Sequence, residues 1–127
     1  SGIGDVIAQA LVLTTGQSVL LLTTAIVIIV LLTCAAGIHP IVATAVIGGA
    51  IDPALCGISV AYLALVLSMS WALGNTICPA SANVIAVADM VQASPMEASL
   101  KWNGSYAVIT AALLIASVML MRGLGFL

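Results

Sequence analysis

Two long stretches without a formal charge constrain the fold of this chain more than any other feature. Residues 6–51 and residues 53–88 contain no Asp, Glu, Lys or Arg. Charged residues make up 5% of the 127 residues, whereas a soluble globular domain contains about 25%. The mean hydropathy is +1.37. We therefore expect an all-α integral membrane protein, with the lipid bilayer as its surroundings.

The same composition argues against several functions. Two basic residues cannot form a phosphate-binding surface, so nucleic-acid binding is excluded. The three cysteines are widely spaced and form no CxxC motif, so they are interpreted as small buried apolar residues. The chain has no GxSxG, no HExxH and no acidic pair within either charge-free stretch, and we expect no enzyme, cofactor or metal cluster.

The longest apolar run predicts a helix that enters the membrane and turns back. Residues 19–36 would form a helix about 27 Å long, close to a hydrocarbon core of about 30 Å. The run ends at Gly37-Ile38-His39-Pro40, where Pro40 disfavours helical geometry at His39 and suits the first position of a new helix. That helix, residues 40–51, is about 18 Å long, too short to span. We favour a re-entrant hairpin over one kinked, continuous span.

A second interruption lies in the stretch 74–83, which reads GNTICPASAN. Gly74 can end a helix, Pro79 removes a backbone donor, and Ser81 or Asn83 can cap the helix that follows. In lipid such a break survives only where protein or a water-lined cavity satisfies the freed backbone groups. The stretch therefore predicts a broken transmembrane helix and a binding site at membrane depth.

A polar connector precedes the last apolar segment. Ser94-Pro95-Met96-Glu97 resembles an N-cap, a first-turn proline and an acidic third position. Glu97 and Lys101 are four residues apart and can pair across one helix face, and Trp102 suits the membrane interface. The expected order within one membrane domain, residues 1–127, is an interfacial helix (1–16), a hairpin (18–52, tip 37–40), a broken helix (58–93, linker 74–83), a surface connector (94–102) and a last span (103–122).

Two broken helices near the bilayer midplane are typical of solute sites in secondary transporters. Helix N-termini after Pro40 and around Asn83 would offer N–H groups to an anionic solute, and helix C-termini near Gly37 and Gly74 would offer carbonyl oxygens to Na⁺. The alternative for each break is a kink repaired by neighbouring groups. The predicted substrate and ion contacts are Gly37, Ile38, His39, Gly74, Asn75, Thr76, Ser81 and Asn83.

Several other residues permit more than one interpretation. A packing or hydrogen-bonding role at the tip is favoured for His39 over a proton carrier or a metal ligand. Asp89 is either a coupling-ion site or the end of a helix in the headgroup region. Tyr62 and Trp71 are interpreted as packing residues, and Gly48-Gly49 as a point of close helix contact.

The order of these segments resembles the C-terminal half of the ion transporter superfamily, which includes the divalent anion:sodium symporters. The closest local match is Cys78-Pro79-Ala80-Ser81-Ala82-Asn83-Val84-Ile85-Ala86-Val87, followed by Glu97, Lys101 and Asn103. The family's Ser-Asn-Thr tip is replaced here by Gly37-Ile38-His39-Pro40, and its Thr-Pro-Pro-Asn-like linker matches clearly only at Asn83. The resemblance implies half of an inverted-repeat, elevator-type carrier, with a second half elsewhere.

The sequence thus favours a secondary active transporter fragment that moves a small anionic solute, driven by Na⁺ or H⁺, in a bacterial or archaeal inner membrane. The alternatives are a passive channel and a non-transporting membrane assembly subunit. Because one chain of this length cannot enclose a pathway alone, we expect a missing N-terminal half, a partner subunit or a homo-oligomer.

Overall fold

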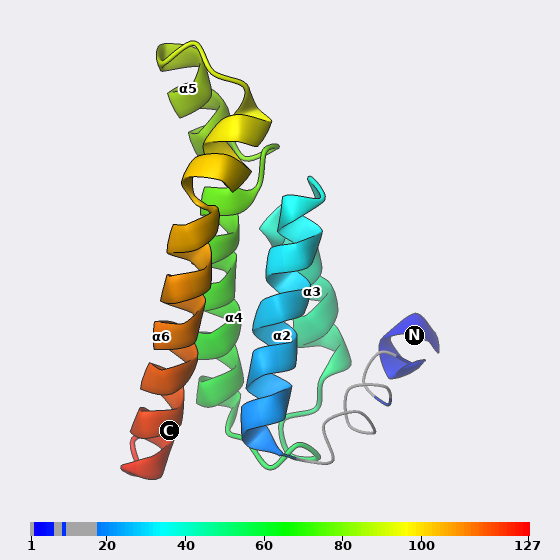
Figure 1. The fold of residues 1–127 in the computed structure, drawn as a ribbon. Helices are drawn as coiled ribbons and strands as arrows, with labels where there is room; N and C mark the ends of the chain where they lie inside the picture. The colour runs from blue at the N-terminus through cyan, green and yellow to red at the C-terminus, as the bar shows by residue number, and fades with distance from the viewer. Residues whose placement is uncertain (1, 7–8, 10–17) are drawn as a thin grey trace.

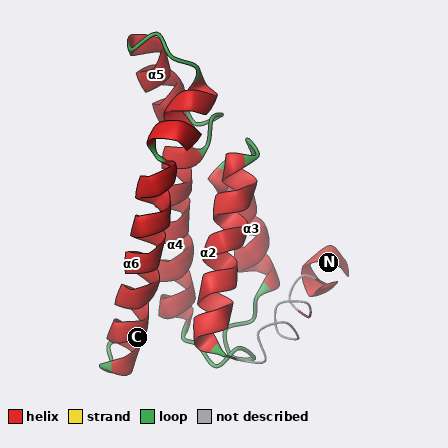
Figure 2. Ribbon diagram, in the orientation of Figure 1, coloured by secondary structure: helices red, strands yellow, loops and turns green. Residues whose placement is uncertain are grey.

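The computed structural model describes residues 2–6, 9 and 18–127, and within these ranges the chain is helical without any strand (Figures 1 and 2). Residues 2–6 and 9 are helical, whereas the rest of the predicted interfacial helix lies outside the described residues. The all-α prediction is confirmed. The elements are α2 (Val19–Ala35), α3 (Pro40–Ala50), α4 (Val60–Ile77), α5 (Ala82–Met90), the π-helix η1 (Glu97–Trp102) and α6 (Gly104–Gly123).

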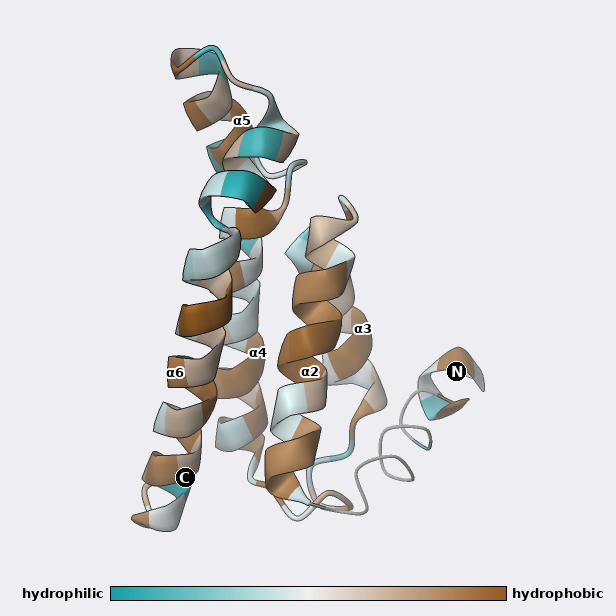
Figure 3. Cartoon of the chain, in the orientation of Figure 1, coloured by the Kyte–Doolittle hydropathy of each residue, from teal (hydrophilic) through white to brown (hydrophobic). Residues whose placement is uncertain are grey.

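Within the described residues, two segments are long and apolar enough to cross a membrane, by length and composition. One is Val60–Met90, which comprises α4, the break after it and α5, and the other is α6. Large apolar side chains cover much of the outer surface: Leu32 is 65% exposed, Val60 74% and Val108 70%. Figure 3 shows apolar colours along α2, α3, α4 and α6, whereas strongly hydrophilic residues gather around α5 and η1. Such an apolar surface suits contact with lipid rather than with water.

The helices α2 and α3 form a hairpin, and glycine makes its turn possible. Gly37 has a φ of +96°, in the left-handed region that glycine adopts without steric cost. This geometry lets the Gly37 N–H donate to the Cys34 carbonyl at 2.9 Å and the Ile38 N–H donate to the Thr33 carbonyl at 3.0 Å. The pair of bonds is a Schellman motif, which ends α2. The chain therefore turns back here instead of continuing as one kinked helix (Figure 1).

Helix α4 is central and packs against α2, α3 and α6. The hairpin approaches α4 closely at Gly74, where an added Cβ would lie 2.7 Å from the Cys34 Sγ and 3.1 Å from the Pro40 Cβ. Gly48 likewise faces α4, because its Cβ would lie 3.1 Å from the Leu67 Cδ1, whereas Gly49 faces open space. Of the two glycines predicted to allow close helix contact, only Gly48 lies against α4.

A small polar cluster joins three helices inside this apolar core. The hydroxyls of Thr23 on α2 and Tyr62 on α4 share a hydrogen bond of 2.7 Å. The Tyr62 hydroxyl also lies 3.4 Å from the Met119 Sδ of α6. Tyr62 is 1% exposed, so these partners satisfy a hydroxyl that lipid could not. At the opposite end of α6 from η1, the Arg122 Nη2 donates to the Gly57 carbonyl at 3.3 Å.

We expect Gly74→Val to lower the free energy of unfolding by about 1–3 kcal/mol, because the new side chain must displace Cys34 and Pro40. Gly49→Val is the matched control, since it brings the same change in helix propensity at a site with no atom within 4 Å of the new Cβ. Thermal unfolding in detergent micelles, followed by circular dichroism, measures both. Equal melting temperatures for the two variants would contradict the packing described at Gly74.

Candidate functional site

The break after α4 is shorter than the sequence predicted. The helix does not end at Gly74 but continues to Ile77, and α5 begins at Ala82, so the interruption comprises residues 78–81 rather than 74–83. The Asn75 Nδ2 donates to the Trp71 carbonyl at 3.2 Å, and the Thr76 Oγ1 donates to the Leu73 carbonyl at 2.7 Å. These polar side chains bond back to their own helix, so they do not open it.

Helix α5 begins at one of the two N-caps that the sequence suggested, Ser81 or Asn83. Ser81 is the N-cap of α5: its Oγ accepts from the Val84 N–H at 3.3 Å and donates to the Asn75 carbonyl at 2.8 Å. Asn83 instead lies inside the first turn of α5 and is exposed. Ser81 is 1% exposed, so a single buried hydroxyl joins the two sides of the break.

The tip of the hairpin lies against this break (Figure 1). The Cys78 Sγ donates to the Ile38 carbonyl at 3.6 Å, a contact between residues 40 positions apart. One turn earlier, Gly74 packs on Cys34 and Pro40, which flank the tip on either side. The two interruptions predicted from the sequence are therefore neighbours in space, and we call this region the tip–break contact.

Carbonyl groups exposed by the break receive donors from the same chain. The Gly74 carbonyl accepts from the Cys78 N–H at 3.0 Å. The Asn75 carbonyl accepts from the Ser81 hydroxyl, and the Thr76 carbonyl accepts from the Asn103 Nδ2 at 2.8 Å. Since a carbonyl oxygen has two lone pairs, each of these oxygens keeps one lone pair with which it could contact a Na⁺ ion.

Helices α3 and α5 both begin at the tip–break contact, and they differ in how many of their first N–H groups already have an acceptor. In α3, Pro40 has no N–H, the Ile41 N–H donates to the His39 Nδ1 at 3.3 Å, and the Val42 N–H donates to the His39 carbonyl at 3.0 Å. His39 is thus the N-cap of α3, the hydrogen-bonding role favoured from the sequence. In α5, the N–H groups of Ala82 and Asn83 have no acceptor within the described part of the chain.

A separate pocket of about 250 Å³ lies between α4, α5 and η1. It contains three of the predicted site residues, Asn75, Thr76 and Asn83, whereas the tip residues and Gly74 are not part of its lining. The sequence pointed to Asn103 only through the family resemblance and to Trp102 only as an interface residue, so both were missed as site residues. The other lining residues are Ala72, Val84, Val87 and Ala98.

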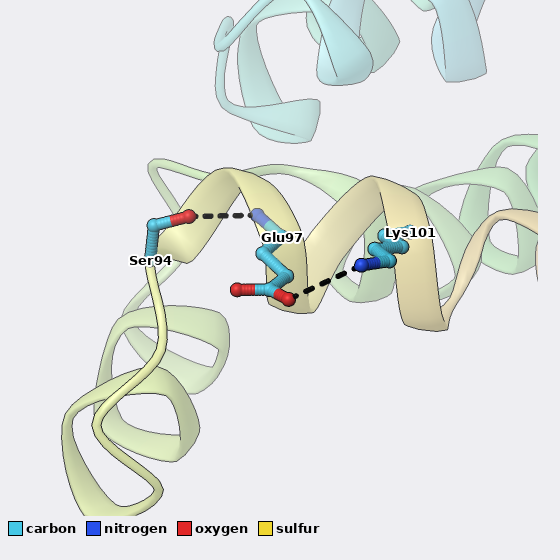
Figure 4. Close-up of polar contacts among 3 residues, drawn as sticks. All are labelled: Ser94, Glu97 and Lys101. Atoms are coloured by element: carbon cyan, nitrogen blue, oxygen red, sulfur yellow. Dashed lines mark hydrogen bonds and ion pairs between the residues drawn. The ribbon is translucent and has the colours of Figure 1, made fainter.

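Charged side chains near this end of the molecule lie outside the pocket lining. The Ser94 Oγ accepts from the Glu97 N–H at 3.1 Å, and the Glu97 and Lys101 side chains are 3.5 Å apart (Figure 4). The Lys101 side chain is exposed and the Glu97 side chain is partly exposed, so this ion pair contributes little to stability. Asp89 is exposed in the last turn of α5. No cluster of His, Cys, Asp and Glu in the described ranges could hold a metal ion.

Comparison of the chain with protein-family models, with curated proteins and with solved structures finds no match.

Substitution Ser81→Ala should destabilise the protein by about 1–3 kcal/mol, because it leaves the buried Val84 N–H and Asn75 carbonyl without their partner. Ser59→Ala is the matched control: Ser59 caps α4 through the Tyr62 N–H but is exposed, so water can replace it at a cost of about 1 kcal/mol or less. Hydrogen exchange should show faster exchange of the Val84 amide in the Ser81 variant. An unchanged exchange rate there would contradict the bridging role of this hydroxyl.

Proposed function

We propose that this chain is part of a secondary active membrane transporter that moves a small anionic solute, coupled to a gradient of Na⁺ or H⁺. The observation that carries the proposal is the tip–break contact, where a hairpin turn and a helix break meet. Two interrupted elements side by side are the arrangement that solute sites in such carriers use.

The lengths of the helices support one placement in the membrane. Helices α4 and α6 have 18 and 20 residues, or about 27 and 30 Å, which matches a hydrocarbon core of about 30 Å. Helix α2, with 17 residues, reaches nearly as far, about 26 Å, before the hairpin turns back. In this placement the hairpin is re-entrant, the tip–break contact lies near one membrane face, and α5 with η1 lies among the headgroups. In this placement the contact is not at the midplane that the sequence suggested, because α4 continues as far as Ile77.

The tip–break contact favours an anion. Helices α3 and α5 both begin there, and helix N-termini carry partial positive charge that stabilises an anion by about 0.3–1 kcal/mol each. The N–H groups of Ala82 and Asn83 have no acceptor among the described residues and can donate to a solute. Residues 53–88 contain no acidic side chain that would repel the solute. The remaining lone pairs of the Gly74 and Asn75 carbonyls would be the contacts for Na⁺.

Opening of the site would separate the hairpin from α4. The polar contact that joins the tip to the break is a thiol to a carbonyl, 3.6 Å long, and thiols are weak donors. A solute could enter where Ile38 now covers Cys78. The complete pathway would be formed with a second half, a partner subunit or a second copy of the chain in a bacterial or archaeal inner membrane.

The protein in liposomes should take up radiolabelled sulfate, phosphate or succinate in a saturable manner that depends on an inward Na⁺ or H⁺ gradient. His39→Ser should lower this uptake while changing stability by no more than about 0.5 kcal/mol, because serine retains the N-cap but lacks the imidazole. His39→Ala removes the cap as well and should cost about 1 kcal/mol. The pair separates a role in solute contact from a role in folding.

Flux that does not saturate and ignores the gradients would indicate a passive channel. No flux of any of the three anions, from protein that is folded in the liposomes, would indicate a non-transporting assembly subunit and would contradict the proposal.

Labelling of Cys78 tests the opening. In a Cys34→Ala, Cys56→Ala background, the remaining thiol is fully buried under the hairpin tip and should react slowly with a water-soluble maleimide. If the tip moves away from the break during transport, an inward gradient together with succinate or sulfate should change the labelling rate. A rate that stays the same with and without each anion and gradient would argue against movement of the tip.

A further inference from the structure

The pocket between α4, α5 and η1 faces away from the hairpin. Gly74 contacts the hairpin, whereas Thr76 lines the pocket. Two residues correspond to about 200° around an α-helix, so these positions lie on opposite faces of α4. The pocket is therefore a second site, distinct from the tip–break contact. Its volume of about 250 Å³ is sufficient for a small headgroup.

Hydrogen bonds within the chain determine which groups this pocket offers. The Nδ2 of Asn75 donates to the Trp71 carbonyl, the Nδ2 of Asn103 donates to the Thr76 carbonyl, and the Thr76 Oγ1 donates to the Leu73 carbonyl. These bonds fix the orientation of both amides and use the hydroxyl proton. The two Oδ1 atoms and the lone pairs of the Thr76 Oγ1 accept no hydrogen bond from the described residues.

A third amide is free to adapt. The side chain of Asn83 lines the pocket and has no hydrogen-bond partner among the described residues. It can turn its oxygen toward a donor at no cost in internal hydrogen bonds. The pocket thus presents up to four side-chain oxygens, three of them held in place by the fold.

The side chains around the pocket favour a cation and offset the partial positive charge of the α5 N-terminus, which borders the pocket at Asn83. Trp102 lines the pocket, and the face of an indole ring attracts cations. No Lys or Arg belongs to the lining. The helices α5 and η1 that flank the pocket contain two acidic residues, Asp89 and Glu97, and one basic residue, Lys101, so their net charge is negative. Trp102 and the hydrophilic residues around α5 and η1 (Figure 3) suit the headgroup layer of a membrane.

We propose that this pocket binds a primary ammonium group. Such a group has three N–H donors, which match the oxygens of Asn75, Asn103 and Thr76, and its charge is stabilised by the Trp102 ring. A quaternary ammonium group has no N–H and cannot make these bonds. The ammonium group belongs either to the ethanolamine headgroup of a phospholipid or to a free amine in the water phase. This inference goes beyond the proposed function and does not depend on transport.

Binding is tested with the full chain in detergent micelles. Phosphatidylethanolamine is titrated against phosphatidylcholine with the same acyl chains, and free ethanolamine against choline, with tryptophan fluorescence and native mass spectrometry as readouts. We expect the primary ammonium form of each pair to bind at least about tenfold more tightly than its trimethylated form, which loses the charge-assisted hydrogen bonds.

Substitutions at Asn83 provide the sharpest comparison, because this exposed side chain has no hydrogen-bond partner to lose among the described residues. Asn83→Asp should tighten ethanolamine binding by about tenfold, and Asn83→Lys should abolish it. Met90→Asp places the same charge on α5 at an exposed residue outside the lining and should leave binding unchanged. Trp102→Leu should weaken binding and remove the fluorescence response.

Preference for phosphatidylethanolamine alone, or for both amines, supports the proposal and identifies the source of the ligand. Equal binding of primary and trimethylated forms, tighter binding of phosphatidylglycerol, or an equal gain from Met90→Asp and Asn83→Asp would overturn it. Absence of anion uptake from protein that still binds ethanolamine would contradict the proposed function alone.

Discussion

Backbone polar groups freed by a helix break must find partners inside the protein, because lipid offers none. The structure around residues 78–81 follows from this constraint. Cys78, Ser81 and Asn103 each donate to one carbonyl in the last turn of α4. The Asn103 bond connects the residue before α6 to the end of α4, 27 positions earlier, and so fixes where the last helix starts. Ser81 fixes where α5 starts. Satisfying the break therefore places the elements on both sides of it.

The hairpin is placed mainly by packing, with one buried hydrogen bond to α4 between the Thr23 and Tyr62 hydroxyls. Because Gly74 has no side chain, α4 can approach Cys34 and Pro40 closely. The buried apolar residues of α2 and α4, among them Val27, Val30 and Val66, then form one continuous core. The tip reaches the break because α2 and α4 are nearly equal in length. Two features far apart in the sequence, a Schellman turn at Gly37 and a proline-containing break after Cys78, therefore lie at one level of the bundle.

Local signals in the sequence predicted local structure well. Gly37 and Pro40 marked the turn of the hairpin, Ser81 was one of two proposed caps, and the Ser94 cap and the Glu97–Lys101 pair are present. The predicted end of α4 at Gly74 was wrong. That prediction relied on the low helix propensity of glycine, asparagine and threonine at 74–76. Packing at Gly74 and side-chain bonds back to the helix outweigh that propensity. The pocket was not predictable, since it forms only when Trp102 and Asn103 fold back beside α4. Asn103 bonds there to Thr76, which is 27 positions earlier in the sequence.

The two faces of α4 differ in how firmly they are held, and this difference has a consequence for movement. On the pocket side, the Asn103 bond to Thr76 and the Ser81 bond to Asn75 join α4 to its neighbours through groups that would be left unsatisfied in lipid if they separated. On the hairpin side, a thiol–carbonyl contact and apolar packing make the connection at the tip. Separation there also breaks the hydrogen bond between the Thr23 and Tyr62 hydroxyls, but each hydroxyl keeps another partner, the Val19 carbonyl and the Met119 Sδ. The Schellman motif and the His39 cap keep the hairpin's own backbone bonds intact. A conformational change in this chain would therefore move the hairpin relative to a unit of α4, α5, η1 and α6, and the pocket would travel unaltered within that unit.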